Sequence, residues 1–307
     1  MNWIMNRIMN RIMNRIMNRI MSRIMIRIMS RIMSRIMSKV MNVLEQASIA
    51  TMLICSLGVC VLGGCALPYR EPNPSFPLTH AEAESDLRRM AESPVALERA
   101  VIVVSGIGDP AVSSAAIVRA IGPTTVGMVI EVDFFDESTF PGARQKLLSE
   151  AALHLGVSVD ELPEVDVVAF SMGGLVARDA AIIDAAGRRL PIRRLFTICT
   201  PHEGARLAGI PLGTPQSEDM KTTSDFIQRL RTARRKYDLC CYTRLDDITV
   251  GEEFAAPEGT ALWWLPTPSG QWAHMQAFDD PRIMADIARR LRGEAPFSTL
   301  PAAPLPN

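Results

Sequence analysis

Ser171 stands in the stretch VDVVAFSMGGLVARD, residues 165–179, where an apolar run gives way to helix-forming sequence. A serine at a sharp strand-to-helix turn can act as a nucleophile when the residues two places before and after it are very small, because the strand and the helix otherwise collide. Gly173 meets this demand downstream, Gly174 lets the helix pack close to the sheet, and Ala169 adds one methyl group upstream. The pattern predicts a nucleophilic Ser171; the alternative is a serine in an ordinary turn.

A nucleophilic serine needs a base, because its hydroxyl is weakly reactive at its own pKa. The chain has four histidines. His80 and His154 lie in segments expected to be helical. His202, in TPHEG, and His274, in SGQWAHM, each follow a strand-like apolar run and are the two candidates for the base.

A carboxylate is expected to orient this base and to stabilise the imidazolium that forms during catalysis. Asp246 and Asp247 follow the apolar run LCCYT and are the candidates for this acid. The alternative is a solvated acidic loop, since Glu252 and Glu253 follow closely.

An oxyanion hole for such a serine needs two backbone N–H donors. Met172, directly after the nucleophile, is the first candidate. The second is Ile107, in VIVVSGIGDP, where Gly106 would let the backbone approach a substrate closely. A plain glycine-containing turn is the alternative interpretation of this loop.

The elements that must position these residues alternate along the chain between strand-like and helical segments. Continuous apolar runs occupy residues 100–104, 126–132, 165–170, 195–199, 239–243 and 261–265. Helical segments are expected at 111–121, 142–155, 173–186, 224–236 and 280–292. Fully apolar strands joined by helices predict an α/β fold with a mostly parallel sheet of about six or more strands flanked by helices. Ligands of such sheets bind at the carboxyl ends of the strands, where the candidate residues stand.

Five motifs in this order carry a resemblance to a known family: VIVVSGIGD, VVAFSMGGLVAR, TICTPHEG, RLDDITV and WAHM. They resemble the α/β-hydrolase serine esterases, in particular bacterial triacylglycerol lipases and the lipase-like proteins related to GPI-inositol deacylases. The resemblance covers about residues 97–293 and implies the α/β-hydrolase fold. Ser105, Phe170 and Ala169 depart from it, since the family usually has histidine at the first position, often histidine at the second, and usually glycine at the third.

The resemblance also selects among the candidates for the catalytic residues. In this family the nucleophile, the acid and the histidine follow one another along the chain, and this order favours His274 over His202. Asp246 is preferred to Asp247, because its D-x-I pattern resembles the family's D-x-[IV]-V turn. The implied catalytic set is therefore Ser171, Asp246 and His274.

The first forty residues are a tetrad repeat, mostly MNRI or MSRI, with nine Lys or Arg residues and no acid. The repeat is interpreted as translated repetitive DNA upstream of a true start at Met37 or Met41; a basic helix on a membrane surface is the alternative. Without it, residues 41–307 hold 24 basic and 33 acidic groups. A mildly acidic body argues against nucleic acid as a partner.

Residues 41–64 are interpreted as a signal peptide. Their apolar run is shorter than a transmembrane helix requires, and it ends in small residues. Its ending LGGC resembles the lipobox of bacterial lipoproteins, which implies cleavage before Cys65 and lipidation of its sulfur. An ordinary signal peptide or an uncleaved anchor is the alternative.

The cysteines that follow Cys65 are Cys199, Cys240 and Cys241, and no pair of them has metal-ligand spacing. Cys199 is expected to be a buried small hydrophobe.

Three further segments complete the expected organisation. Residues 65–96 form a proline-rich tether and a short surface helix, which begins with the capping-box spacing of Thr79 and Glu82. Within the hydrolase domain, residues 203–236 form a lid-like insertion. Its terminal basic run is interpreted as a solvated face rather than as a surface that contacts anionic head groups. The proline-rich tail, residues 294–307, is expected to be loose.

The function expected from these features is a lipid-anchored serine hydrolase of the bacterial cell envelope. It would cleave carboxylic esters, including lipids, through an acyl-serine intermediate and without a metal or an organic cofactor. The alternatives are an acyltransferase with the same triad and a catalytically inactive hydrolase domain that serves as a scaffold. Protein partners, oligomeric state and acyl chain length are not specified by the sequence.

Overall fold

The computed structural model describes residues 71–106, 108–209 and 214–306. The tetrad repeat, the signal-peptide-like segment, Cys65 and Ile107 lie outside the described residues, so the expectations for them stay predictions. No helix in the described part of the chain is both long and apolar enough to span a membrane.

A six-stranded sheet forms the centre of the domain, with the strand order β4-β2-β5-β6-β7-β8. Every neighbouring pair in this sheet is parallel. The strands are β2 (Val101–Val104), β4 (Val129–Val132), β5 (Val165–Phe170), β6 (Ile192–Ile198), β7 (Asp238–Arg244) and β8 (Leu262–Leu265). A separate two-stranded parallel sheet joins β1 (Val95–Ala96) to β3 (Thr125–Val126). The predicted fold class, a mostly parallel α/β sheet flanked by helices, is confirmed.

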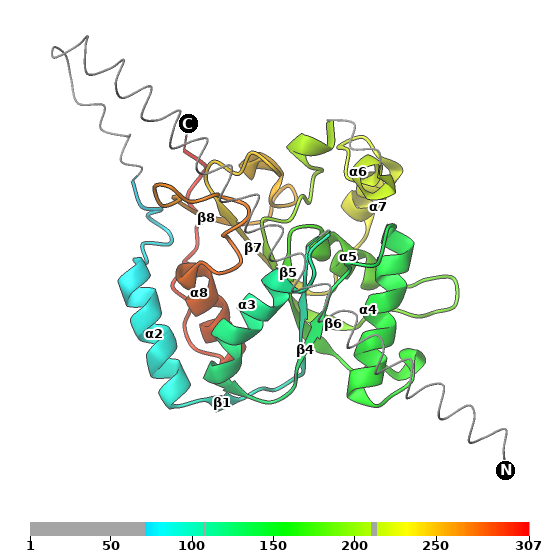
Figure 1. Ribbon diagram of the computed structural model, residues 1–307, viewed down its shortest axis with the longest axis horizontal. Coiled ribbons are helices and arrows are strands. Elements are labelled where there is room, and N and C mark those ends of the chain that lie inside the picture. Colours follow the sequence, from blue (N-terminus) through cyan, green and yellow to red (C-terminus); the bar gives the residue numbers. More distant parts are fainter. Residues whose placement is uncertain (1–70, 107, 210–213, 307) are drawn as a thin grey trace, which may run out of the picture. The chain divides into compact units, whose positions relative to one another are not determined.

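Helices cover both faces of the large sheet (Figure 1). One face carries α2 (His80–Glu92), α3 (Val112–Ile121) and α8 (Pro281–Leu291), and the other carries α4 (Phe140–Leu155), α5 (Met172–Ala180) and α7 (Asp225–Thr232), with the short α6 (Pro215–Asp219) near α7. Along β2, Val101 and Val103 pack toward α2, α3 and α8. Ile102 and Val104 pack toward the helices on the other face. A strand buried on both faces explains why the sequence shows continuous apolar runs rather than alternation.

The helix boundaries follow local capping chemistry. The capping box of Thr79 and Glu82 is confirmed at the start of α2. The Asp280 side chain accepts a hydrogen bond from the backbone N–H of Arg282 at the start of α8. However, α5 ends at Ala180, earlier than the expected residue 186. The carboxylate of Asp184 accepts hydrogen bonds from the backbone N–H groups of Ala186 and Arg188, which offers this backbone a turn instead of a helix.

The segment before α2 packs on the domain, although the sequence predicts a tether over residues 66–79. The Asn73 side-chain amide donates to the carbonyl of Trp264 over 2.8 Å. The ring of Phe76 is buried against Tyr242, with ring centroids 6.2 Å apart. The expectation of a tether is therefore wrong for residues 73–78.

The C-terminal tail is also attached to the domain. The buried carboxylate of Asp286 in α8 accepts hydrogen bonds from the backbone N–H groups of Phe297 and Ser298. The backbone N–H of Thr299 donates to the carbonyl of Ser75 over 2.9 Å. The expectation of a loose tail is wrong, because these backbone groups find partners on the domain.

Candidate active site

Ser171 stands between the end of β5 and the start of α5 in a backbone conformation that non-glycine residues rarely adopt. Its φ is 51° and its ψ is −129°, and its backbone N–H donates to the carbonyl of Ile198 on β6. Such strain persists only where the surrounding structure enforces it, and it is concentrated at functional sites. The carboxyl end of a central strand thus presents the serine side chain at the edge of the sheet.

The residues around Ser171 explain why this turn needs small side chains. A Cβ atom on Gly173 would lie 2.3 Å from the carbonyl oxygen of Ser105, and one on Gly174 would lie 2.2 Å from Oγ1 of Thr200. Both glycines are therefore sterically required. Ala169 is buried in the core beneath α5, so the upstream position accommodates the additional methyl group.

Three side chains form a continuous hydrogen-bonded relay at this edge of the sheet. His274 Nε2 lies 3.0 Å from Ser171 Oγ, and His274 Nδ1 lies 2.8 Å from Asp247 Oδ2. An ionised carboxylate only accepts hydrogen bonds, so Nδ1 carries the proton and Nε2 accepts from the serine hydroxyl. All three residues are buried, with exposed fractions of 7% for Ser171, 8% for His274 and 0% for Asp247.

The environment of Asp247 keeps its carboxylate ionised and fixed. Burial raises the pKa of the Asp247 carboxyl, but hydrogen bonds from His274 and Val250 outweigh this effect and hold the pKa below its ordinary value. Oδ1 accepts from the backbone N–H groups of Thr249 and Val250, which leaves Oδ2 for His274. This is the arrangement that orients a catalytic imidazole.

The carboxylate that contacts His274 belongs to Asp247, so the preference for Asp246 as the acid is wrong. Asp246 is exposed and adopts a left-handed backbone with φ of 68°, so the chain reverses at this residue. Its backbone N–H donates to the side chain of Glu252. The reversal directs the next side chain, that of Asp247, into the domain and toward His274.

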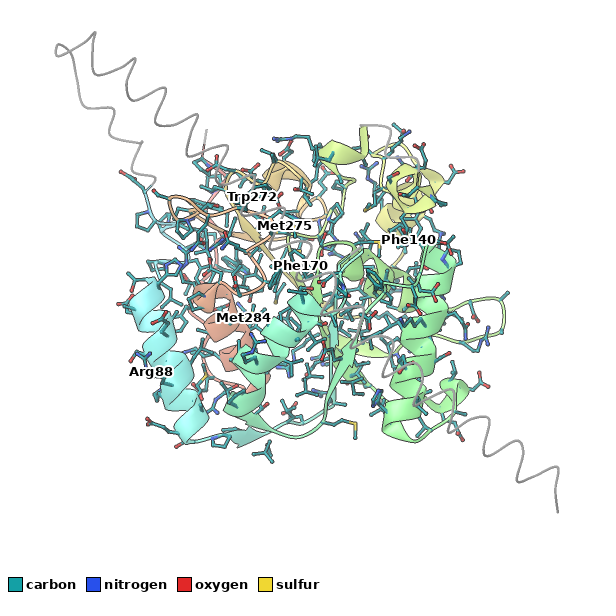
Figure 2. The ribbon with its side chains drawn as sticks, in the orientation of Figure 1. Arg88, Phe140, Phe170, Trp272, Met275 and Met284 are labelled. Atoms are coloured by element: carbon teal, nitrogen blue, oxygen red, sulfur yellow. The ribbon has the colours of Figure 1, made fainter. Side chains whose placement is uncertain are left out.

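The loop that carries His274 is held by Phe170, noted in the sequence only as a departure from the family pattern, and by Arg244, which no motif indicates. The ring of Phe170 packs against the imidazole of His274 with ring centroids 5.1 Å apart, and Phe170 also contacts Phe278. The buried Arg244 donates to Gln271 in the same loop and to Asp280 at the start of α8. Figure 2 shows Phe170 near Met275, the residue that follows His274.

One of the two oxyanion candidates can be placed. Met172 is the first residue of α5, so its backbone N–H has no acceptor within the helix and lies directly after the serine. Gly106 lies beside the nucleophile, since a Cβ atom there would be 3.3 Å from Cβ of Ser171. Ile107 is not among the described residues, and its role stays a prediction.

His202, the alternative base, lies away from this relay. It is completely buried, with Nδ1 3.0 Å from Nη1 of Arg178 and Nε2 2.9 Å from Oγ1 of Thr197. Burial and the positive charges of Arg178 and Arg235 hold its pKa well below the ordinary value. His202 is thus a neutral structural group in the core.

A cavity of about 380 Å³ opens next to Ser171 and His274. Most of its lining is apolar, and residues of the 203–236 insertion contribute one wall, namely Ala205, Leu207, Ala208, Thr214, Ser217 and Met220. At its rim, Val112 is 58% exposed and Met275 is 55% exposed. The cavity can hold an apolar chain next to the serine hydroxyl.

Cys199, expected to be a buried small hydrophobe, is buried and also lies near the carboxylate of Asp247. Burial together with the negative charge of Asp247 raises the pKa of the Cys199 thiol well above the ordinary value. Cys199, Asp247 and His274 place three potential metal ligands within 4.8 Å of one another. The Asp247 and His274 atoms of this group already form a hydrogen bond within the relay.

The sequence carries signals for only some of the residues at this site. Asp247 stands two residues before Thr249, and an aspartate commonly binds the backbone N–H two residues on, as Asp247 does here. Asp246 stands two residues before Ile248 in the same way, so this pattern does not choose between the two acids. Phe170 occupies the position before the nucleophile, so its side chain had to lie near the site. The pairing of Arg244 with Gln271 joins residues 27 positions apart, and no local pattern indicates it.

No protein-family model and no curated protein matches the chain. A structural match is the lipase BlEst2 of Bacillus licheniformis in its propeptide form, at 15% identity and a TM-score of 0.47, covering 67% of this chain and 52% of that one. The chain thus spans about half the length of that lipase. An esterase of Pyrobaculum calidifontis matches at 14% identity and a TM-score of 0.43, covering 69% of this chain and 90% of that one. The thioesterase RedJ of Streptomyces coelicolor matches at 13% identity and a TM-score of 0.41, covering 66% of this chain and 94% of that one.

Proposed function

We propose that this chain is a serine hydrolase that cleaves carboxylic esters through an acyl-serine intermediate. The observation that carries the proposal is the relay of Ser171, His274 and Asp247 at a strained strand-to-helix turn. A serine, an imidazole and a buried carboxylate in this order perform acyl transfer on unrelated folds, so the geometry itself supports the chemistry.

The proposed reaction begins with proton transfer from Ser171 Oγ to His274 Nε2 as the oxygen attacks the ester carbonyl. Asp247 stabilises the imidazolium, and the backbone N–H of Met172 donates to the developing oxyanion. His274 then protonates the leaving alcohol. A water molecule, activated by the same imidazole, attacks the acyl-serine and releases the acid.

An apolar ester is the proposed substrate class. The lining of the cavity and the exposed apolar side chains Val112 and Met275 at its rim favour an acyl chain over a polar substituent. Trp272, in the same loop as Met275, is 74% exposed. Such a rim favours contact with lipid substrates at an interface.

We further propose, from the sequence alone, that lipidation of Cys65 anchors the enzyme in the bacterial cell envelope. Mass spectrometry of the mature N-terminus tests this part separately. A chain that begins at a diacylated Cys65 supports the anchor, and an unmodified cysteine contradicts it.

Labelling with a fluorophosphonate probe tests the catalytic proposal. Wild type is expected to be labelled at Ser171, and Ser171→Ala is expected to lose the label. Ser217→Ala is the matched control, because Ser217 lines the same cavity but its hydroxyl donates to the carbonyl of Thr214. Absence of labelling in the folded wild type, or labelling mapped to Ser217, would contradict the proposal.

Rates on p-nitrophenyl esters of increasing acyl length then test the substrate class. The specificity constant kcat/KM is expected to rise from acetyl to medium chains, because each additional methylene can be buried against the apolar wall. Highest activity on the acetyl ester would contradict an apolar acyl site.

A further inference from the structure

A second cavity, of about 430 Å³, lies away from Ser171 and is surrounded by basic side chains. Its walls include residues near the amino ends of β6 and β7, namely Ile192 and Tyr237. Ser171 follows the carboxyl end of β5, at the opposite edge of the sheet. Arg178 comes seven residues later, about 10 Å along α5. The two cavities are therefore separate sites.

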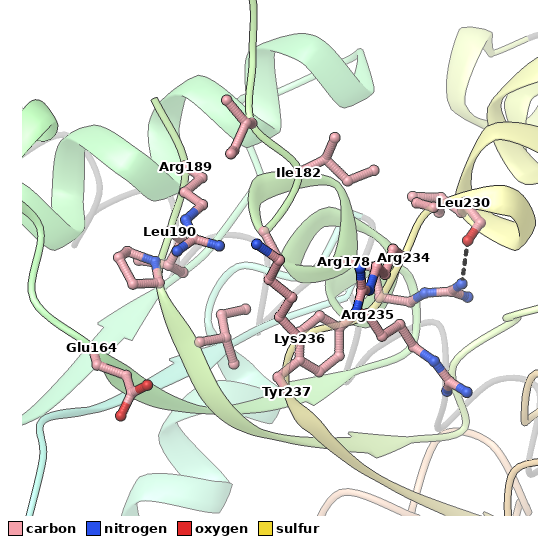
Figure 3. Close-up of a pocket in the computed structure, with 15 residues that line it drawn as sticks. Glu164, Arg178, Ile182, Arg189, Leu190, Leu230, Arg234, Arg235, Lys236 and Tyr237 are labelled. Carbon is pink, nitrogen blue, oxygen red and sulfur yellow. Dashed lines mark hydrogen bonds between the residues drawn. The ribbon is translucent and has the colours of Figure 1, made fainter. Parts of the chain in front are cut away.

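The charges around this cavity are strongly unbalanced. Its basic lining residues are Arg178, Arg189, Arg234, Arg235 and Lys236. The single acidic residue in the lining is Glu164, whose carboxylate accepts a hydrogen bond from Arg99 over 2.8 Å. Figure 3 shows Arg189 and Lys236 reaching toward the same space from two sides. The cavity therefore has a net positive charge that no carboxylate of its own lining balances.

Arg178 is the deepest of these cations, with only 3% of its surface exposed. Within the described residues its guanidinium contacts no carboxylate. It donates to the Leu230 carbonyl over 2.7 Å and approaches His202 Nδ1 to 3.0 Å. Burial lowers the pKa of this guanidinium. A buried cation without a counter-charge is costly, so an anion in the cavity would stabilise it.

Neighbouring cations outside the cavity behave differently. Arg229 and Arg231 belong to the same basic run, but Arg229 pairs with Asp179 and Arg231 pairs with Glu203. By contrast, Arg189, Arg234 and Lys236 make no hydrogen bond or ion pair with any described residue. The unpaired cations of this region thus gather around the cavity, and the side chains of the basic run are exposed, as its interpretation as a solvated face predicts.

We propose that this cavity binds a phosphate-bearing organic anion. Guanidinium groups match the geometry of phosphate oxygens, and several converging cations favour a multiply charged group. The volume exceeds that of one phosphate, and the side chains of Ile182 and Leu190 provide apolar wall for an organic portion. The source of the phosphate is either a soluble phosphomonoester or the head group of an anionic phospholipid.

Titration calorimetry of the full chain with inorganic phosphate and with glycerol 3-phosphate, at constant ionic strength, tests this site. Both ligands are expected to bind saturably, and glycerol 3-phosphate more tightly. Arg189→Gln and Lys236→Gln are each expected to weaken binding about tenfold, the effect of losing one charge-assisted hydrogen bond. These residues are preferred to Arg178 because a variant of the buried arginine can fail to fold.

Two controls keep the result specific. Arg119→Gln removes one exposed arginine of α3 outside the cavity and is expected to bind phosphate as wild type does. Ser171→Ala is expected to bind phosphate unchanged, so the outcome is independent of the proposed hydrolase activity. Absence of saturable binding, or equal weakening by Arg119→Gln, would overturn the proposal.

Vesicles distinguish the two sources of the phosphate group. Phosphatidylglycerol and phosphatidylcholine vesicles are added separately to the Ser171→Ala chain, which is not expected to hydrolyse them. If phosphatidylglycerol vesicles displace glycerol 3-phosphate and phosphatidylcholine vesicles do not, a lipid head group binds at the cavity. If neither kind of vesicle displaces glycerol 3-phosphate, the result supports a soluble phosphomonoester.

Discussion

Phe170 packs its ring against the imidazole of His274, with ring centroids 5.1 Å apart and planes inclined at 42°. The residue directly before Ser171 therefore forms an apolar wall against the imidazole of His274. On its other side the same ring meets Phe278 edge to face. One short segment, residues 170–171, thus supplies both the proposed nucleophile and a support for the proposed base.

Replacing Phe170 with leucine is expected to loosen the imidazole while preserving an apolar core. We expect kcat on a p-nitrophenyl ester to fall about tenfold, equivalent to about 1.4 kcal/mol, with little change in KM. Steady-state kinetics check this. Phe196→Leu is the matched control, because Phe196 is equally buried in the adjacent strand β6 and makes no ring contact with His274. An equal loss of kcat in both variants would show a general packing effect.

Asp247→Asn and Asp246→Asn separate the two candidate acids. The first substitution removes the charge that stabilises the imidazolium and is expected to lower kcat by about 10³–10⁴. The second changes an exposed side chain and is expected to leave kcat within about twofold of wild type. Both variants are compared with wild type in the same esterase assay. A large loss of kcat in Asp246→Asn alone would instead identify Asp246 as the acid that orients His274.

His202 is expected to make the free energy of unfolding depend on pH, at pH values below the pKa that its imidazole has in the unfolded chain. The unfolded chain binds a proton at this histidine below about pH 6.5, whereas the folded protein does not, because the folded pKa is far lower. Unfolding free energy should thus fall with decreasing pH, by up to about 1.4 kcal/mol per pH unit from this group. The depressed pKa of Asp247 acts in the same direction but only below about pH 4.

Urea unfolding between pH 5 and pH 7.5 measures this contribution. His202→Gln is expected to be less stable at every pH but to show a shallower pH dependence. His154→Gln is the control, since the His154 side chain is 50% exposed. An unchanged slope in His202→Gln would contradict a neutral buried imidazole.

The tight turn at Ser171 predicts opposite outcomes for two small substitutions. Ala169→Gly is expected to retain esterase activity and to cost about 1 kcal/mol of unfolding free energy, because a buried methyl group is lost. Gly173→Ala places a methyl group against the carbonyl of Ser105. It is expected to cost about 1–3 kcal/mol and to abolish fluorophosphonate labelling. Normal labelling of Gly173→Ala would show that the turn can relax.

The fold was predictable because its signals are local and repeated. Apolar runs identified all six strands of the large sheet, and Thr79 and Asp280 marked the starts of α2 and α8. The position of Ser171 followed from the same logic, since a turn between a buried strand and a helix exposes its side chain at the sheet edge. The two-residue strands β1 and β3 were too short to produce a separate pattern.

The choice between Asp246 and Asp247 was not predictable from spacing, because one residue in the left-handed conformation reverses the side that each carboxylate faces. The attached tail was missed for a different reason. Its proline content indicates the absence of helix and strand, but not the absence of partners. The carboxylate of Asp286, which is distant in sequence, provides those partners.

The contact between the two ends of the described domain has a topological consequence. The backbone N–H of Ala303 donates to Oγ of Ser75, beside the bond from Thr299 to the same residue. The path of the chain is thereby nearly a closed ring. A short linker that joined these two segments, with new ends opened in the exposed turn at residues 185–187, would give a circularly permuted chain with the same sheet and the same relay.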